Sequence, residues 1–230
     1  GENSPMRLDL EEGAGLLNRE IFIVNAAVNE EAKPTSFFCG DPIQSHRAGE
    51  LFVEEHACLT VPEQADVVVA NSHPMNLDFR QSIKCVGNSL HAAKPEGVML
   101  AYVRCEQGLG EMPLPKKTLS YNVMRTVLKV LGKKRILPLV ERIKKDEPVE
   151  EVFISHFGLQ MLRRNHLAAF SDSAKLPADV GRKLGLCRSF TDLGEMMAWA
   201  GTKAPTNATV WVVPFGGSSY ARLDGNGKKS

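Results

Sequence analysis

A glutamine and a lysine three residues apart, Gln81 and Lys84, are the polar pair in this sequence best suited to hold an anion. They lie at positions i and i+3 of a helix predicted over residues 78–93, so both side chains project from one face. A lysine near a helix start opposes the helix dipole, at a cost of up to about 1 kcal/mol. An anion bound at the free N–H groups of the first turn offsets that cost, and a carboxylate is the natural guest. The alternative is that both side chains are merely exposed to solvent.

The opposite face of the same predicted helix is apolar. It carries Phe79, Ile83, Val86 and Leu90 at i, i+4, i+7 and i+11, which is the stripe expected of a helix packed on a core. The pattern therefore predicts that this segment lies on the protein body and turns Gln81 and Lys84 away from it.

Alternating strands and helices must position this pair. Buried strands are predicted over residues 21–28, 35–39, 65–70, 98–103, 166–170 and 209–213. Helices are predicted between them over residues 41–56, 78–93, 121–131, 136–145, 149–164, 178–184 and 191–200. Strands spaced by helices indicate an α/β fold of Rossmann-like type, with a mostly parallel sheet, helices on both faces and a partly helical insertion after residue 110.

The helix near residue 41 has a clear start signal. Asp41 is a suitable N-cap, Pro42 suits the first helical position, and Gln44 follows three residues after the cap. The pattern predicts that this helix buries Ile43, Ala48, Leu51 and Phe52.

The domain organisation is predicted to be simple. Residues 1–223 are expected to form one α/β domain, in which residues 105–148, rich in Gly, Pro and Lys, are a candidate insertion. Residues 224–230 are expected to be a disordered tail.

Three segments of unusual composition follow predicted strands, at residues 71–76, 104–110 and 214–219. Ligands of open parallel sheets bind outside the carboxyl ends of the strands. The three segments are therefore expected to meet in a cleft, where their glycines allow close backbone approach to a ligand. For any one segment, a plain turn is the competing interpretation.

Composition excludes several classes of partner. The formal net charge is +1, so neither nucleic acid nor an anionic membrane is indicated. No apolar run reaches the roughly 18 residues that span a bilayer, and the first residues do not resemble a signal peptide. Five scattered cysteines without a CxxC pair suit a reducing compartment, and we expect a cytoplasmic protein. The six histidines form no metal-ligand spacing, so a metal site built within this chain is not expected.

Three motifs resemble those of nickel-dependent lactate racemase homologues. Residues 40–49 (GDPIQSHRAG) resemble the family's GD-x-x-x-AHRAG segment. Residues 74–84 (PMNLDFRQSIK) resemble its GGxPxDxNxYQxxK motif, and residues 105–110 (CEQGLG) resemble its C-x-E-GLG segment. The resemblance covers residues 1–110 and is diffuse beyond them.

The resemblance implies a two-domain enzyme that interconverts stereoisomers of a 2-hydroxy acid by hydride transfer through a nickel-pincer nucleotide. In that family the acid/base histidine pair, the nickel ligand and the lysine joined to the cofactor belong to the N-terminal domain. The chain would then be a C-terminal lid domain without catalytic residues of its own, inactive without the N-terminal domain of the same protein. Its remaining partner would be a small carboxylate substrate.

The resemblance also assigns residues that line the substrate and cofactor. The glutamine and lysine of its YQxxK motif fall on Gln81 and Lys84. This sequence departs from the motif, with Ser72 and His73 at its glycines, Asn76 at its aspartate, Arg80 at its tyrosine and Phe157 near a family tryptophan. Arg80 precedes Lys84 by four residues, so two cations could share a larger or more acidic substrate than lactate. The expected lining set is His73, Asn76, Arg80, Gln81, Lys84 and Phe157.

Two other functions stay open on the sequence alone. One is a non-catalytic module that binds an anion or small molecule and derives from the same family. The other is an unrelated α/β domain, such as a nicotinamide-dependent enzyme.

Overall fold

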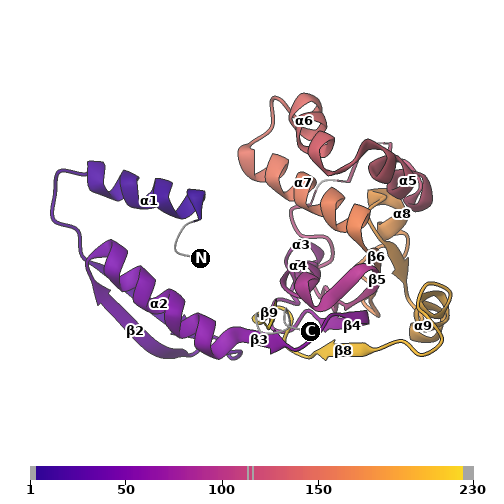
Figure 1. Cartoon of the computed structure of the whole chain (residues 1–230), viewed down its shortest axis with the longest axis horizontal. Helices are drawn as coiled ribbons and strands as arrows, with labels where there is room; N and C mark the ends of the chain where they lie inside the picture. Colours follow the sequence, from indigo (N-terminus) through magenta and orange to yellow (C-terminus); the bar gives the residue numbers. More distant parts are fainter. Residues whose placement is uncertain (1–3, 113, 116, 225–230) are drawn as a thin grey trace. The chain divides into compact units, whose positions relative to one another are not determined.

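The chain folds into two compact units, Gly1–Cys58 and Leu59–Ser230 (Figure 1). The computed structural model describes residues 4–112, 114–115 and 117–224. The predicted single domain over residues 1–223 placed no boundary at Cys58. Of the predicted disordered tail, residues 225–230 lie outside the described residues, whereas the backbone N–H of Asp224 donates to the carbonyl of Val61 at 2.9 Å.

The N-terminal unit is a hairpin with two helices. Strands β1 (Ile23–Val28) and β2 (Pro34–Gly40) pair antiparallel, and helices α1 (Pro5–Leu16) and α2 (Pro42–Ala57) flank them in the chain. Helix α1 was not predicted. It is joined to α2 by Arg47, whose Nε and Nη2 donate to the Glu11 carboxylate at 2.9 and 2.8 Å. Hydrogen bonds from Arg47 and then Arg7 lower the pKa of Glu11 to about 2.

Helix α2 begins as its sequence predicts, but its predicted apolar face is wrong. The Asp41 side chain accepts from the N–H groups of Ile43 and Gln44, both at 3.0 Å, which confirms the cap. Leu51 is nevertheless 63% exposed, and Ala48 is exposed as well. The helix packs against the hairpin through Phe52, whose ring lies 5.5 Å from that of Phe38. The hairpin has two strands, and Leu51 and Val53 of α2 stay exposed beside it.

The C-terminal unit is built on a parallel sheet, which confirms the predicted α/β class. Its five strands are ordered β7-β6-β5-β4-β8, and each neighbouring pair is parallel. The strands are β4 (Ala65–Asn71), β5 (Ala93–Tyr102), β6 (His166–Phe170), β7 (Arg188–Phe190) and β8 (Val210–Val213). Strands β3 (Cys58–Val61) and β9 (Tyr220–Leu223) form a separate pair. Neither they nor β7 were predicted; each has only three or four residues and lacks the continuous apolar run that marks the equally short β8.

Helices cover both faces of this sheet, as predicted. Alternate strand residues, such as Val68 and Met99, belong to a large cluster with α4, α5, α6, α7 and α8. Their neighbours Val67 and Leu100 belong to a smaller cluster with α9. The bounds of the helices are α3 (Phe79–Ser82), α4 (Lys84–Asn88), η1 (Leu90–Ala92), α5 (Tyr121–Leu131), α6 (Lys133–Ile143), α7 (Val149–Arg164), α8 (Val180–Leu184) and α9 (Leu193–Gly201).

The part of the predicted insertion over residues 121–143 is helical and belongs to the core. Leu128 of α5 and Ile136 and Val140 of α6 are buried in the larger cluster. Both helices pack with α7, as their stacked ribbons in Figure 1 show. Residues 121–143 are therefore part of the layer that covers one face of the sheet.

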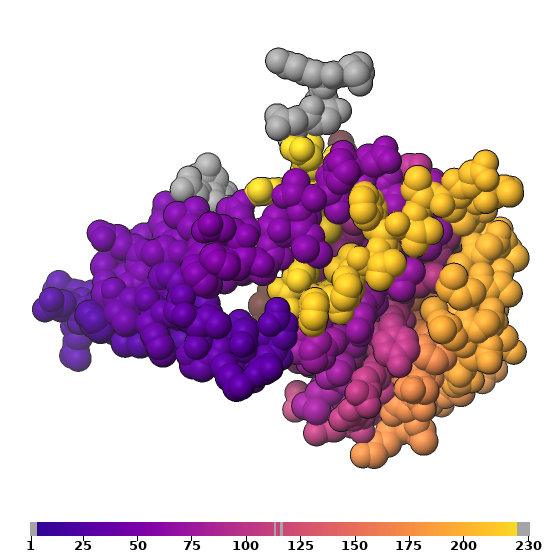
Figure 2. Space-filling model, turned by 90° about the horizontal axis from the view of Figure 1, so that it is seen from below, coloured from indigo at the N-terminus to yellow at the C-terminus, as the bar shows by residue number. Residues whose placement is uncertain are grey.

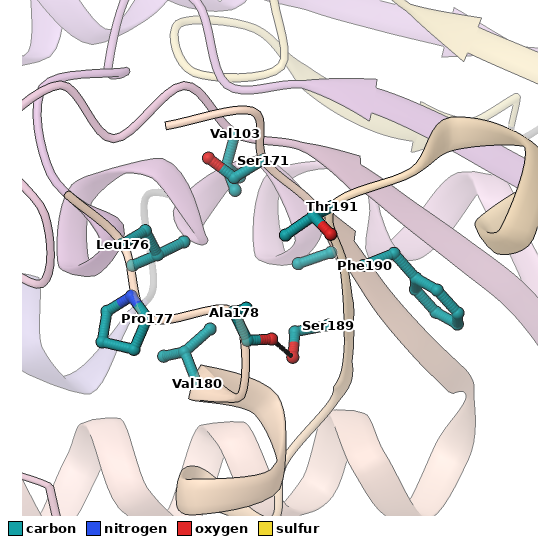
Figure 3. A pocket seen from close by; sticks show the side chains of 10 residues that line it. Val103, Ser171, Leu176, Pro177, Ala178, Val180, Ser189, Phe190 and Thr191 are labelled. Carbon is teal, nitrogen blue, oxygen red and sulfur yellow. Dashed lines mark hydrogen bonds between the residues drawn. The ribbon is translucent and has the colours of Figure 1, made fainter. Parts of the chain in front are cut away.

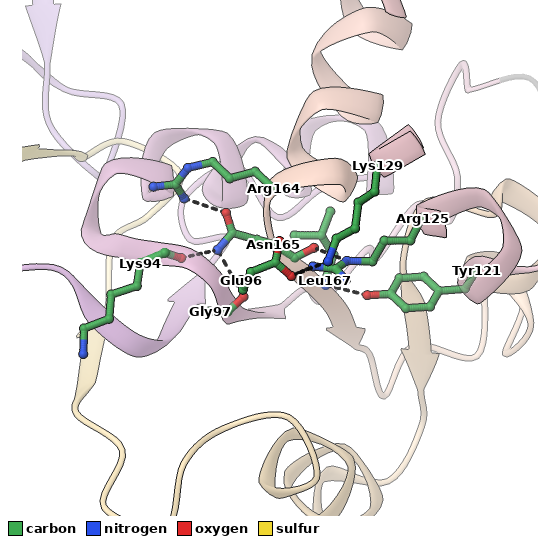
Figure 4. Close-up of polar contacts among 9 residues, drawn as sticks. All are labelled: Lys94, Glu96, Gly97, Tyr121, Arg125, Lys129, Arg164, Asn165 and Leu167. Atoms are coloured by element: carbon green, nitrogen blue, oxygen red, sulfur yellow. Dashed lines mark hydrogen bonds and ion pairs between the residues drawn. The ribbon is translucent and has the colours of Figure 1, made fainter. Parts of the chain in front are cut away.

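A polar cluster fixes these helices to the amino ends of β5 and β6 (Figure 4). The buried Asn165 donates through Nδ2 to the carbonyls of Lys94 and Gly97, at 2.8 and 3.1 Å. Arg125 of α5 pairs with Glu96 at 2.6 Å. Buried polar groups stabilise a fold only when they are satisfied in this way. Because this cluster lies at the amino ends of the strands, it does not occupy the opposite edge of the sheet, where the carboxyl ends can form a binding site.

Candidate functional site at the carboxyl ends of the strands

The sheet reverses its order between β4 and β8. From β4 the chain moves outward through β5, β6 and β7, and it then returns to β8 on the other side of β4. Such a reversal places the preferred ligand crevice outside the carboxyl ends of the two strands concerned. The segments that leave these ends, residues 71–76 and 214–219, are two of the three that the sequence singles out.

Hydrogen bonds show that the three segments gather at this edge, whereas the cleft expected between them stays a prediction. Gln107 donates its N–H to the carbonyl of Leu77 at 2.7 Å, and Phe79 donates to the carbonyl of Gly108 at 2.8 Å. These bonds hold the segment after β5 against the start of α3.

The segment after β8 is fastened to the segment after β4. The N–H of Gly217 donates to the carbonyl of His73 at 3.2 Å. Asn88 of α4 donates through Nδ2 to the carbonyl of Gly216 at 2.9 Å. Asn88 lies on the polar face predicted to carry Gln81 and Lys84, but its contact is with the protein itself.

The glycines of these segments approach the chain rather than a ligand, which corrects the prediction from the sequence. A Cβ on Gly217 would lie 2.2 Å from the carbonyl oxygen of Ser72. A Cβ on Gly110, where φ is +65°, would lie 2.6 Å from Cγ of Asp78. Because real side chains cannot approach so closely, glycine is required here for the segments to pack on one another.

The predicted helix over residues 78–93 is broken into short pieces. Helix α3 is one turn of four residues, Ile83 separates it from α4, and η1 completes the segment. The apolar stripe is still oriented as predicted, since Phe79 and Val86 are buried.

The start of α3, where free N–H groups were expected to bind an anion, is already capped by other groups of the protein. The side chain of Asp78 accepts from the N–H of Gln81 at 2.8 Å, and the carbonyl of Gly108 accepts from Phe79. A single capped turn also has little dipole. Any anion must therefore be held by side chains.

Gln81 and Lys84 lie together, as the sequence predicts. Lys84 Nζ donates to Gln81 Oε1 at 2.6 Å, and the lysine is exposed. This bond uses one ammonium hydrogen and the amide oxygen, so two ammonium hydrogens and the amide NH₂ group stay available as donors. Such a group of donors suits a carboxylate or a phosphate.

Arg80 is already paired within the protein, so it is not a second cation available to substrate. Its Nη2 donates to Oε1 of Glu151 at 2.9 Å, and its Nη1 reaches the carbonyl of Glu111 at 3.5 Å. Glu151, in the first turn of α7, was not singled out from the sequence. Its acidic type in a predicted first turn was visible, but its partner, 71 residues away in the chain, was not.

The other predicted lining residues lie in two places. His73 and Asn76 are half-buried in the segment after β4, and the His73 ring lies 5.7 Å from that of Phe215. Phe157 of α7 lies against α4, since a Cβ on Gly87 would be 2.8 Å from its ring. The helix that begins at Lys84 therefore has an aromatic neighbour.

Two buried thiols near this edge are not nucleophiles at neutral pH. Burial raises the pKa of Cys85 to about 12 and that of Cys105 to about 11. The thiolate is the reactive form of cysteine, and these values leave almost none of it.

One cavity of the C-terminal unit is too small to hold a substrate. The cavity beside β6 and β7 (Figure 3) has a volume of about 10 Å³, which is room for one water molecule at most. Within residues 4–112, 114–115 and 117–224, no three His, Cys, Asp or Glu side chains are grouped to hold a metal ion. In the same residues, no helix has the length and apolar character needed to cross a membrane.

Comparison with known proteins relates the fold to a lactate racemase. No family model and no curated protein matches the sequence. Among solved structures, the lactate racemase apoprotein from Thermoanaerobacterium thermosaccharolyticum aligns with a TM-score of 0.75 and 21% identity, over 96% of this chain and 50% of that one. A protein from Thermotoga maritima aligns with a TM-score of 0.52 and 11% identity, over 95% of this chain and 53% of that one. The chain thus has a lactate racemase-like fold and spans about half the length of these structures.

Proposed function

We propose that this chain is one half of a 2-hydroxy-acid racemase or epimerase, in which Gln81 and Lys84 bind the substrate carboxylate. The observation that carries the proposal is the bonded pair of Gln81 and Lys84, exposed beside the reversal of strand order in a lactate racemase-like fold. An ammonium and an amide that converge on one point orient a carboxylate without reacting with it. Their role is to position substrate.

The reacting groups are expected in the other half of the enzyme. Among the described residues no metal-ligand group is present, and the buried thiols are protonated. The resemblance in the motifs implies a nickel-pincer nucleotide, which would supply hydride-transfer chemistry when bound. The pair of Gln81 and Lys84 suits the anionic parts of such a nucleotide or its substrate, and the described residues hold no cluster of three or more metal-binding side chains. We therefore assign binding, and no catalytic step, to this chain.

A reconstituted enzyme tests the proposal. The chain is joined to the half of the Thermoanaerobacterium lactate racemase that it does not cover, cofactor is supplied, and racemisation of lactate and larger 2-hydroxy acids is followed by chiral chromatography. Lys84→Ala and Gln81→Ala are each expected to reduce turnover at least about tenfold, or about 1.4 kcal/mol. Lys134→Ala, which removes an exposed lysine of α6, is the matched control and is expected to change nothing.

Two outcomes would contradict the proposal. Wild-type rates in both variants would refute the role of the pair. Binding of hydroxy acids that depends on Lys84, without any conversion by the reconstituted protein, would identify the chain as a binding module.

A further inference from the structure

The N-terminal unit has regular elements but almost no interior. Among its described residues, Ser45 is the one buried side chain, and the buried hydrophobic side chains found in the described part of the chain all lie at Val61 or beyond. A two-stranded hairpin is marginally stable in water unless its apolar surface is packed. This unit therefore needs a covering that its own described residues do not supply.

Helix α2 covers one face of the hairpin. Phe38 of β2 packs against Phe52, and Gly49 allows the helix to come close, since a Cβ there would lie 3.2 Å from the Phe38 ring. Strand side chains alternate between faces, so the residues on either side of Phe38 point away from α2.

The other face is apolar and exposed. It consists of Val24, Ala26 and Val28 of β1 and of Phe37 and Cys39 of β2, and we call it the outer hairpin face. Val24 and Phe37 are each 64% exposed, and the strand register pairs Val24 with Cys39 and Ala26 with Phe37. Strand β2 lies beneath α2 in Figure 1, so Figure 2, seen from below, shows this unit from its hairpin side. A continuous apolar surface of this kind marks an interaction site.

The comparison indicates which partner fits. The alignment with the lactate racemase uses 96% of this chain and 50% of that one, so half of that protein has no counterpart in this sequence. We propose that the outer hairpin face docks a polypeptide domain equivalent to that uncovered half, in the same polypeptide or in a separate one. The proposal rests on the proposed function, which also requires a second half. It adds the surface through which the two halves join.

The chain contains its own reporter for this contact. Cys39 is exposed on the outer hairpin face, and Cys58 is half-buried outside it. The rate of thiol alkylation at each cysteine, measured by mass spectrometry of the 230-residue chain, reports coverage of the face. The probe is the uncovered half of the Thermoanaerobacterium lactate racemase, produced as a separate polypeptide. Light scattering follows the oligomeric state.

On addition of the probe, alkylation of Cys39 is expected to slow at least about tenfold, while that of Cys58 is unchanged. The variant Phe37→Thr is expected to abolish this protection because it removes an aromatic ring from the face and keeps a residue that favours strands. Val212→Thr is the matched control, since Val212 is a strand valine of the C-terminal unit with the same 64% exposure as Val24. It is expected to leave protection intact.

Three results would overturn the proposal. Cys39 protected in the monomeric chain alone would mean that the chain covers its own face. Protection that rises with chain concentration, together with a dimer mass, would identify a second copy as the occupant. Cys39 that stays reactive with the probe present would mean that the face does not dock it. Racemisation activity of the same mixture separates the two proposals. If the mixture is active while Cys39 stays reactive, the docking proposal is wrong and the proposed function stands.

Discussion

Arg80 of α3 and Glu151 of α7 form an ion pair, with Nη2 and Oε1 2.9 Å apart. The pair joins the turn that carries Gln81 to the helix that carries Phe157. A charge that the sequence left available for substrate is thereby balanced within the protein.

The contribution of this pair to stability is expected to be small but measurable. Its side chains are 27% and 23% exposed, so solvent screens them only in part. A double-mutant cycle with Arg80→Ala and Glu151→Ala is expected to give a coupling of about 0.5–1 kcal/mol in urea unfolding, and less in high salt. Lys145 and Asp146, which are 75% and 87% exposed and 3.9 Å apart, form the control pair, with no coupling expected. Equal couplings in the two cycles would contradict the prediction.

Glu151 is also expected to tune substrate preference in the reconstituted enzyme. Glu151→Gln removes the charge that neutralises Arg80, so the guanidinium becomes available to a second carboxylate. We expect kcat/KM for dicarboxylic relative to monocarboxylic 2-hydroxy acids to rise about threefold or more, as about 0.6 kcal/mol of a surface ion pair would give. Arg80→Tyr is expected to lower the same ratio. If Arg80→Tyr leaves the ranking of substrates unchanged, Arg80 has no role in selecting them.

Gly217 is expected to tolerate no side chain. In Gly217→Ala the new Cβ would meet the carbonyl oxygen of Ser72, so the segments after β4 and β8 must separate. The free energy of unfolding, measured by urea titration, is expected to fall by about 1–3 kcal/mol, which is usual for overpacking. Gly201→Ala, at a helical glycine with no atom within 4 Å of the added Cβ, is the control and is expected to be neutral or slightly stabilising. Equal urea midpoints for the two variants would show that the backbone at Ser72 moves away from the added Cβ at little energetic cost.

Stability is expected to fall in mild acid because of His166. Burial, and then the charge of Arg125, lower the pKa of this histidine to about 4. An unfolded histidine titrates near 6.5, so between about pH 6.5 and 4 the unfolded chain binds a proton that the folded chain does not. The free energy of unfolding should therefore decrease as pH falls through this window, by at most about 1.4 kcal/mol per pH unit.

The variant His166→Gln isolates that effect. It removes the titrating ring, whereas carboxylates with lowered pKa values, such as Glu11 and Asp66, contribute equally to both proteins. The slope of unfolding free energy against pH should be flatter in the variant between pH 6.5 and 4. Parallel slopes would mean that His166 binds its proton over the same pH range in the folded and unfolded chains.

The sequence predicted the frame well because its signals are local. The apolar run from Ala65 marks a central strand, and Asp41 followed by Pro42 marks the start of α2, and both lie where they were expected. The face of α2 could not be predicted, because which of its apolar side chains are covered depends on the width of the hairpin beneath it. Leu51 fits an apolar stripe in sequence and is 63% exposed in the fold.

The candidate site was predicted only where spacing along one segment decides the geometry. Gln81 and Lys84 are three residues apart, and the helical conformation of Ile83 between α3 and α4 keeps them close although the helix is broken. The partner of Arg80 and the cap of Phe79 come from distant parts of the chain. No local pattern reveals such contacts. The sequence therefore suggested that Arg80 and the start of α3 were available to a ligand, whereas in the fold both are bonded to other parts of the protein.

The glycine contacts between the segments after β4 and β8 also bear on how this scaffold can diverge. Because Gly217 rests on the backbone at Ser72, an insertion in either segment displaces both. Loop length is therefore a poor route to new substrates in this protein. Exposed side chains of the segment after β4, such as Met75 and Leu77, can be exchanged without disturbing this packing. The lineage is expected to vary at those positions while the lengths of the two segments stay constant.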